Sequence, residues 1–298
     1  MTHLKVLFAV LVWGGSFAFT KRALLEVSPL ALVLARCGLG SAVMLVCVRW
    51  GAFFRGLRTK DWLQLAAVSL SGVLGQQLIQ AFALQHTSAM HGGWILSATP
   101  IVVAAAMALF FNERMGKKRW GGFFLGAAGT ALVVSSRQVA AGAVVPTGWG
   151  DLIFMTSCFN WALYVIMTDR WLKHLPQQVV TGMSMVMGFV LLIPICVGSG
   201  QWQELLHVSR SGWLCLAYLG IFSSGAGYLF WNAAVEKIGP SASSSFLYIE
   251  PFAALITARL ILGETVASLA VLGGMLILTG VYWVNAGRAL PSAPEEAA

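Results

Sequence analysis

Residues 82–113 read FALQHTSAMHGGWILSATPIVVAAAMALFFNE, and residues 231–264 read WNAAVEKIGPSASSSFLYIEPFAALITARLILGE. Both stretches run through small and polar residues to a proline, continue as an apolar run, and end at a glutamate. A shift of 151 residues places Pro100 on Pro251, and the proline lies 13 residues before the final glutamate in both copies. Agreement at one constant shift predicts an internal repeat.

The same shift aligns further residues over about 70 positions without a gap. The matched pairs are Trp62 with Trp213, Ala83 with Ala234, Leu96 with Leu247, Leu109 with Leu260, Gly122 with Gly273, and Gly129 with Gly280. The repeat therefore extends well beyond the stretch around the prolines.

The composition is that of a chain that lies in lipid. Of its 298 residues, 58% are hydrophobic and 10% are charged, whereas soluble domains carry roughly 25% charged residues. The five cysteines lie in apolar runs without metal-ligand spacing, so we expect buried thiols and no disulfide. The net charge of +8 is spread over short loops, which fits membrane topology better than nucleic-acid binding.

Ten apolar segments are long enough to cross roughly 30 Å of hydrocarbon as helices. We expect them near residues 4–20, 29–48, 62–84, 92–111, 119–136, 149–168, 179–198, 213–234, 241–262 and 267–286.

Lysine and arginine set the expected orientation. The loops on the same side of the membrane as the N-terminus hold thirteen of these residues, and the loops on the other side hold five. Both termini are therefore predicted to face the cytoplasm of a bacterial inner membrane. Five spans per repeat force the second copy to lie upside down relative to the first, as in many secondary transporters. The predicted fold is all-α, with two inverted five-helix repeats, residues 1–138 and 149–288, around a central cavity. A linker, 139–148, joins them, and a disordered tail, 289–298, follows.

On these residues the chain resembles the drug/metabolite transporter superfamily, in its ten-span type built from two EamA-like domains. The resemblance covers about residues 4–287 and is carried by the following motifs: Val12-Trp13-Gly14-Gly15-Ser16, Ala35-Arg36, Ala83 through Pro100 to Glu113, and Pro251 to Glu264. It is nearer to bacterial amino-acid and aromatic-metabolite exporters than to nucleotide-sugar carriers. It implies export of small metabolites through a cavity lined by spans 1, 3, 4, 6, 8 and 9. The second repeat departs from the first, since Asn160-Trp161 replaces Trp-Gly-Gly and no arginine matches Arg36.

Polar and aromatic side chains share a face of otherwise apolar segments in both halves. Trp13, Ser16 and Thr20 recur at three- and four-residue spacing in the first segment. The sixth segment carries a similar stripe: Asn160, Trp161, Tyr164 and Thr168. We interpret the two stripes as walls of a cavity whose rings stack on a flat or cationic substrate, with helix packing or interfacial anchoring as the alternative. Gln76, Gln77 and Gln80 in the third segment bond either other helices or the substrate.

Segments four and nine place small and hydroxyl-bearing residues ahead of a proline. Pro100 and Pro251 each free a backbone carbonyl one turn earlier, which predicts interrupted helices at corresponding positions of the two halves, the sequence signal of a transporter site. The alternative is a kinked helix with tight packing.

Two charges fall inside the spans, and such charges are costly unless they are paired or hydrated. Glu250 either binds a substrate ammonium or carries a coupled proton, or it pairs with Arg36 or a helix end; Arg36 is interpreted as structural. Glu113 and Glu264, at span ends, are expected to lock helix ends and loops.

The candidate substrate-binding residues are Trp13, Ser16, Gln77, Gln80, Trp94, Trp161, Tyr164, Ser244, Tyr248 and Glu250. No catalytic, cofactor or metal site is predicted; His86 and His91 lie five apart across an expected loop, and no P-loop motif is present. The expected partners are a small molecule, such as an amino acid, and the lipid bilayer. Transport of flat cationic drugs is the alternative function, and a membrane-embedded enzyme would need titratable groups or a metal that the spans lack. The sequence leaves proton coupling, and the choice between monomer and homodimer, open.

Overall fold

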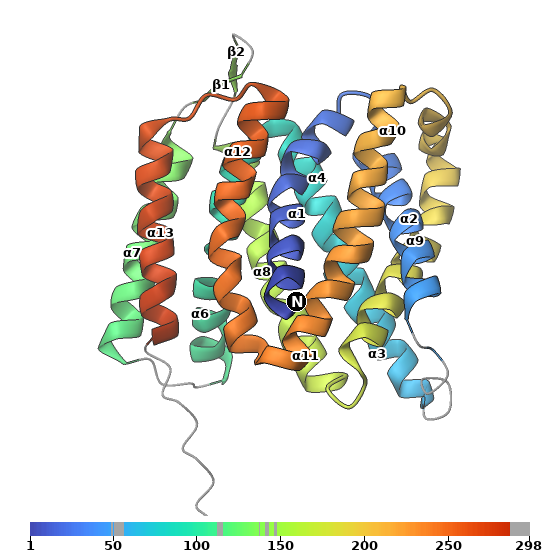
Figure 1. Cartoon of the computed structure of the whole chain (residues 1–298), viewed down its shortest axis with the longest axis horizontal. Helices are drawn as coiled ribbons and strands as arrows, with labels where there is room; N and C mark the ends of the chain where they lie inside the picture. The colour runs from blue at the N-terminus through green and yellow to red at the C-terminus, as the bar shows by residue number, and fades with distance from the viewer. Residues whose placement is uncertain are drawn as a thin grey trace, which may run out of the picture.

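The computed structural model describes residues 1–48, 50, 57–111, 116–136, 138–140, 143–145 and 148–286. These residues form a bundle of nearly parallel helices (Figure 1). The elements are α1 (Thr2–Ala23), α2 (Pro29–Cys47), α3 (Thr59–Ser69), η1 (Leu70–Gly75), α4 (Gln76–His86), α5 (Ala89–Leu96), α6 (Thr99–Phe111), α7 (Lys117–Ser135), β1 (Gln138–Ala140), β2 (Ala143–Val145), α8 (Trp149–Trp171), α9 (Gln177–Ser199), η2 (Gln201–Leu206), α10 (Arg210–Ala217), η3 (Tyr218–Ala226), α11 (Gly227–Ser245), η4 (Phe246–Ile249), α12 (Glu250–Leu262) and α13 (Ser268–Ala286).

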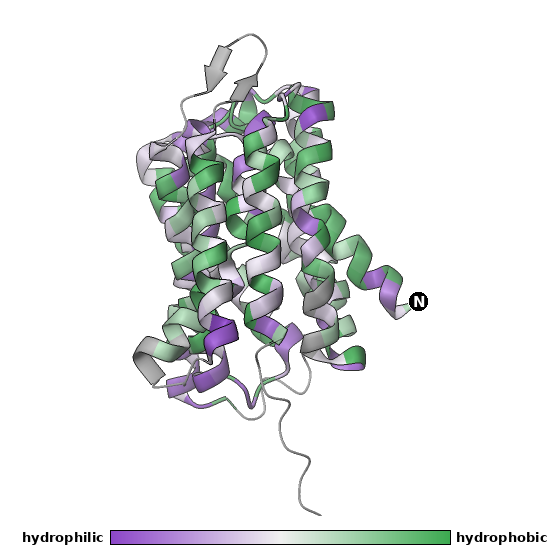
Figure 2. Ribbon diagram, turned by 90° about the vertical axis from the view of Figure 1, so that its left-hand side faces the viewer, coloured by the Kyte–Doolittle hydropathy of each residue, from purple (hydrophilic) through white to green (hydrophobic). Residues whose placement is uncertain are grey.

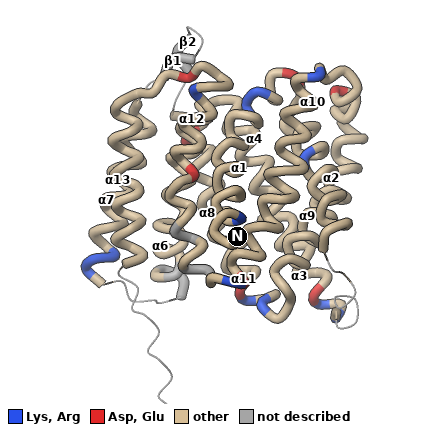
Figure 3. The backbone as a smooth tube through the Cα atoms, in the orientation of Figure 1, with Lys and Arg blue, Asp and Glu red and all other residues tan. Residues whose placement is uncertain are grey.

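The outside of the bundle is suited to lipid. Eight helical segments of the described chain are long and apolar enough to cross a membrane, and α7 and α12 run beside them to complete ten passes. Large apolar side chains face outward, among them Val46, Leu63 and Leu260, and Figure 2 shows apolar residues along the middle of the helices with hydrophilic ones gathered toward the two ends. The charged residues are concentrated at the same two ends (Figure 3). The protein is therefore an all-α integral membrane protein, as predicted.

The two halves are inverted relative to each other. In this description the hairpin end is the end of the bundle that carries β1 and β2, at the top of Figure 1, and the opposite end is the one where α13 finishes. Helix α1 finishes at the hairpin end, whereas α8, its counterpart in the second half, begins there. Helices α7 and α13, the last of each half, pack side by side and antiparallel, with Gly122 against Gly280 and Gly129 against Gly273.

The helix interruptions predicted from the prolines are present in both halves. The fourth pass breaks between α5 and α6 at Ser97 and Ala98, and the ninth pass narrows to the 3₁₀ segment η4 just before Pro251. The ninth pass also begins with a kink at Gly239, whose φ of 81° lies in the left-handed region that favours glycine. These breaks divide the ninth pass and leave α12 only 13 residues long.

Two features were not predicted. The third and eighth passes each contain a π-helical segment, η1 and η3, and the shift of 151 residues carries residues 70–75 onto 221–226 within η3. π-Helical turns are often found beside functional sites. The linker carries a short antiparallel hairpin in which Gln138 pairs with Val145. Glu113 and the predicted tail, residues 289–298, lie outside the described residues.

Candidate functional site

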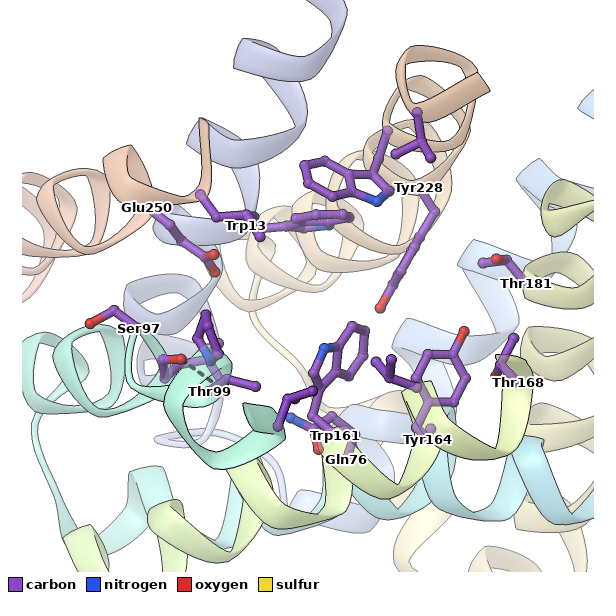
Figure 4. Close-up of a pocket in the computed structure, with 18 of the residues that line it drawn as sticks. Trp13, Gln76, Ser97, Thr99, Trp161, Tyr164, Thr168, Thr181, Tyr228 and Glu250 are labelled. Atoms are coloured by element: carbon purple, nitrogen blue, oxygen red, sulfur yellow. Dashed lines mark hydrogen bonds between the residues drawn. The ribbon is translucent and has the colours of Figure 1, made fainter. Parts of the chain in front are cut away.

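A cavity of about 770 Å³ lies between the two halves. Its wall is built by all six predicted spans: α1, the third pass, the fourth pass, α8, α11 and the ninth pass. Four further helices contribute, α2 through Arg36, α7 through Arg119, α9 through Gln177 and Thr181, and α13 through Asn285. Figure 4 shows the side chains from both halves converging on this space.

Eight of the ten candidate residues line this cavity. They are Trp13, Ser16, Gln77, Gln80, Trp161, Tyr164, Tyr248 and Glu250. The side chain of Ser244 lies outside the described part of the structure. Eight residues singled out from the sequence thus line one cavity, and their role in substrate binding stays a prediction.

Trp94 does not line the cavity. Its side chain is 0% exposed and lies flat on α13, where a Cβ added to Gly274 would be 2.2 Å from the indole ring. The edge of the ring meets Phe252, with 5.6 Å between ring centroids. Because Gly274 leaves room for an indole between α5 and α13, this tryptophan fills the helix interface instead of facing the cavity.

The wall is symmetric in position and asymmetric in chemistry. The shift of 151 residues relates seven pairs of lining residues: Trp13 with Tyr164, Phe17 with Thr168, Gln77 with Tyr228, Gln80 with Trp231, Leu96 with Leu247, Ser97 with Tyr248, and Thr99 with Glu250. Tyr228 and Trp231 were missing from the sequence-based candidates, yet the repeat carries the signal for them, since their partners Gln77 and Gln80 were included.

Aromatic rings gather on the side of the cavity formed by α1 and α11. Trp13 contacts Tyr228 and Trp231, with ring centroids 5.1 and 5.3 Å away. On the other side Trp161 lies 4.9 Å from Tyr164 (Figure 4). Such rings bind flat apolar groups and attract cations through their faces.

Trp13 and Tyr164 each contact a π-helical segment of a facing pass. The Trp13 Nε1 donates to the carbonyl oxygen of Ser223, at 2.9 Å, and the ring of Tyr164 covers Gly72 so closely that an added Cβ would lie 1.9 Å from it. The shift of 151 residues relates Gly72 to Ser223, so the two contacts are counterparts. Both rings are therefore held by the backbone of the pass that faces them.

The sequence left two roles open for the glutamines, hydrogen bonding between helices and binding of the substrate, and Gln76 and Gln77 differ in this respect. Gln76 accepts a hydrogen bond from Asn160 Nδ2 at 3.0 Å, which joins the third pass to α8. The side-chain oxygen of Gln77 is buried and has no hydrogen-bond partner among the described residues. Gln76 thus holds helices together, whereas Gln77 leaves a carbonyl oxygen unsatisfied beside the cavity.

The two charges within the membrane are separate. Arg36 donates from Nε to Ser224 Oγ at 2.9 Å and from Nη2 to Ser223 Oγ at 3.1 Å. The Glu250 carboxylate has neither a hydrogen bond nor an ion pair with the described residues, and it points into the cavity (Figure 4). The alternative in which Glu250 pairs with Arg36 is therefore not found.

A buried polar network lies toward the hairpin end, outside the cavity wall. Asp151 accepts hydrogen bonds from His91 Nδ1, at 2.8 Å, and from Thr87 Oγ1, and His91 Nε2 lies 2.9 Å from Ser136 Oγ. Lys21 Nζ donates to the carbonyl oxygen of Thr87. His91 was expected at the entry of the fourth segment, where a loop ends; it lies inside α5, is fully buried, and joins α5 to α8. Asp151 was not singled out at all, although an acidic residue in the first turn of a helix is a recognisable signal.

Two further contacts fasten the hairpin end. The buried carboxylate of Glu264 accepts from the backbone nitrogens of Ala89 and Met90, at 2.9 and 3.1 Å, so it locks the start of α5 as expected for a helix-end group. Glu26, in the loop after α1, accepts from the hydroxyl and backbone nitrogen of Ser209, and these hydrogen bonds lower the pKa of the Glu26 carboxyl. The cavity wall instead continues to the opposite end, where Arg119, Asp169, Lys173, Gln177 and Asn285 line it.

Comparison with known proteins gives one consistent result. Residues 1–135 and 148–286 each match the model of the EamA-like transporter family. An uncharacterized transporter, YyaM, of Bacillus subtilis is 28% identical over 300 residues, which cover 98% of this chain and 97% of that protein. An uncharacterized transporter of Archaeoglobus fulgidus is 29% identical over 285 residues, covering 96% and 97%.

One relative has a more specific name. A probable terminal-alkyne amino-acid exporter of Streptantibioticus cattleyicolor is 24% identical over 285 residues, covering 94% of this chain and 92% of that protein. A solved crystal structure superposes with a TM-score of 0.59 over 95% of this chain and 97% of its own, at 19% sequence identity. That likeness supports the fold alone.

Proposed function

This chain belongs to the EamA-like transporter family, and from that premise we propose that it exports small amphipathic metabolites, with amino acids, aromatic ones included, as the leading class. The observation that carries this proposal is the cavity between the inverted halves, in which aromatic rings and amides surround the Glu250 carboxylate, which is unpaired among the described residues. An aromatic amino acid needs an apolar wall for its ring and polar groups for its charged end. The amino-acid exporter among the relatives supports the same class.

The proposed substrate-binding residues are Trp13, Ser16, Gln77, Gln80, Trp161, Tyr164, Tyr248 and Glu250, joined by Tyr228 and Trp231. We retain residues 1–138 and 149–288 as the two units that move, with 139–148 as their linker. The wall and the helix breaks lie at corresponding positions of both units, which suits a site at the interface of inverted repeats.

The proposed mechanism is alternating access. Buried polar contacts lie at the hairpin end beyond the cavity wall, whereas the wall itself reaches the helix ends at the other. This asymmetry supports a state that is closed at the hairpin end. Rocking of the two units, with bending at the breaks near Pro100 and Gly239, would open the hairpin end and close the other. The basic loops favour a cytoplasmic opposite end, in which case the structure is in a state that loads substrate from the cytoplasm of the inner membrane.

Transport assays with the purified protein test this proposal. Proteoliposomes loaded with unlabelled amino acids are expected to take up labelled tryptophan, phenylalanine or other amino acids by exchange. The same assay with and without a pH gradient measures proton coupling, for which Glu250 is the candidate. Inert proteoliposomes across a broad metabolite panel would count against the proposal.

A second candidate function is export of flat organic cations. It is favoured by one observation, the exposure of Glu250 to a cavity that also presents the Trp13, Tyr228 and Trp231 rings. A carboxylate with aromatic faces is a suitable site for a cation. A planar cationic dye included in the same panel separates the two functions.

A further inference from the structure

Two opposite charges face one cavity without touching each other. Arg36 and Glu250 both line the cavity and are both half-buried. No ion pair joins the Arg36 guanidinium to the Glu250 carboxylate, both of which lie in the described part of the chain. A charge within the membrane is costly unless it is paired or hydrated. Two such charges left apart indicate that something other than the protein completes them.

The partners of Arg36 are neutral. Its guanidinium donates to the hydroxyls of Ser223 and Ser224 on η3, which fix its direction without neutralising its charge. A guanidinium has five donors arranged to hold a carboxylate with two parallel hydrogen bonds. Its Nη1 atom makes no hydrogen bond to the described residues. Arg36 is therefore oriented, still charged, and able to accept an anionic group from the cavity.

Glu250 presents the complementary charge from the other half. It begins α12 directly after the 3₁₀ segment η4 and before Pro251. Its backbone is held close to α1, because a Cβ added to Gly14 would lie 2.5 Å from the Glu250 carbonyl oxygen. The start of a helix favours a negative charge, so the carboxylate is placed rigidly while its oxygens remain available to a cation.

Trp13 connects the two charges in space. The indole nitrogen of Trp13 donates a hydrogen bond to the backbone carbonyl oxygen of Ser223, and the hydroxyl of Ser223 accepts one from Arg36. Gly14, the next residue after Trp13, packs against the backbone of Glu250. Tyr228, which contacts the Trp13 ring, lines the same cavity as Arg36 and Glu250. The cation and the anion thus flank one aromatic wall of the cavity.

Each charge is present in only one of the two repeats. The shift of 151 residues relates Arg36 to Met187 and Glu250 to Thr99. Arg119, Asp169 and Lys173 also line the cavity, but they lie at the opposite end of the bundle. Within the spans the wall therefore presents one positive and one negative charge, which defines a single orientation for a substrate that carries both charges.

From this geometry we infer that Arg36 and Glu250 form a split receptor for a zwitterion, in which Arg36 holds the carboxylate of a free amino acid and Glu250 holds its ammonium group. The side chain of the substrate lies against the rings of Trp13, Tyr228 and Trp231. The inference rests on the proposed function and narrows it, because a compound that lacks either charged group would leave one protein charge unpaired within the membrane.

Competition among three compounds with the same ring tests the receptor. Uptake of labelled phenylalanine into proteoliposomes is measured with unlabelled phenylalanine, 2-phenylethylamine or 3-phenylpropionate as competitor. For the wild-type protein the amine and the acid are expected to compete at least tenfold more weakly than phenylalanine. If 2-phenylethylamine inhibited the uptake of labelled phenylalanine as strongly as unlabelled phenylalanine does, the split receptor would be overturned. The proposal of amino-acid export would still stand.

Two variants assign the poles. Arg36→Gln should bring the amine and phenylalanine to similar potency, and Glu250→Gln should do the same for the acid. Arg210→Gln and Glu236→Gln, which alter exposed residues outside the cavity wall, are the matched controls and should retain the wild-type ranking. Arg36→Lys keeps the charge but loses the two-pronged geometry, so it serves if Arg36→Gln does not fold, and it should retain the ranking with weaker phenylalanine binding.

The outcomes separate the two proposals. Variants that keep the wild-type ranking would overturn the assignment of the poles. A wild-type protein that carries the amine but no amino acid would contradict the proposed function as well, and so would one that carries none of the three compounds.

Discussion

Gly129 of α7 packs directly against Gly273 of α13: a Cβ built on Gly129 would lie 2.5 Å from the Gly273 carbonyl oxygen, and one built on Gly273 would lie 2.6 Å from that of Gly129. Gly122 and Gly280 make the equivalent contact, at 2.5 Å in both directions. The shift of 151 residues turns Gly122 into Gly273 and Gly129 into Gly280, so each contact is the image of the other. This exchange is possible only if the two halves are related by a twofold axis and run in opposite directions.

The first prediction concerns this glycine contact. Gly273→Ala should lower the free energy of unfolding of the detergent-solubilised protein by about 1–3 kcal/mol, because the new methyl group meets backbone atoms that cannot rotate away. The change should appear as a lower unfolding midpoint. Gly198→Ala in α9 is the matched control; nothing lies within 4 Å of its added Cβ, so it should be neutral or stabilise the helix by up to about 1 kcal/mol. Equal unfolding midpoints for the two variants would contradict the close contact.

The second prediction concerns the cavity wall. Trp161→Ala should reduce amino-acid transport at least tenfold with a smaller loss of thermal stability than removal of a fully buried tryptophan, because the ring is only partly buried and faces the cavity from the edge of a hydrophobic cluster. Trp149→Ala in the same helix removes an exposed ring and should leave the transport rate nearly unchanged. Initial uptake rates in proteoliposomes, measured with melting curves of both variants, test this. A general loss of stability in Trp161→Ala would indicate packing instead.

Most of the fold could be predicted from the sequence, because the repeat and the parity of the spans fix the topology before any side chain is placed. Pro100 and Pro251 also predicted the helix breaks correctly, since a missing backbone donor has a local effect. The π-helical segments η1 and η3 could not be predicted in this way. They depend on how the facing passes pack, as Gly72 does beneath Tyr164.

The candidate site was predicted less completely, for a related reason. Helical spacing shows which residues share a face, but it does not show which neighbour that face meets. Trp94 lies within its span much as the cavity tryptophans lie within theirs. It is nevertheless buried, because Gly274, on a helix far away in the sequence, leaves room for its indole ring. His91 and Asp151 are 60 residues apart in sequence, and their contact requires the packing of α5 on α8.

The third prediction concerns the buried polar network at the hairpin end. Asp151→Ala removes the shared acceptor of His91 and Thr87, so it should lower stability and increase the population open at that end. The measurement is labelling of a cysteine introduced at Ser97 in the cavity wall, with a membrane-impermeant thiol reagent applied from the hairpin side. Labelling should be several times faster than in the Ser97→Cys protein alone. Thr156→Ala, an exposed position of the same helix, is the control, and equal labelling rates would exclude a closing role for Asp151.

The last prediction concerns orientation in the membrane. The N-terminus lies in the lower half of Figure 1 and α13 also finishes there, whereas the hairpin stands at the other end. The distribution of Lys and Arg over the loops predicts that the lower end faces the cytoplasm. A fluorescent protein fused to the C-terminus should therefore fold and fluoresce, and alkaline phosphatase fused after residue 140 should be active because it is exported. The reverse pattern would invert the membrane orientation and make the structure a state open to the outside. Termini found on opposite sides would contradict the ten-pass topology itself, because an even number of crossings returns the chain to the side from which it started.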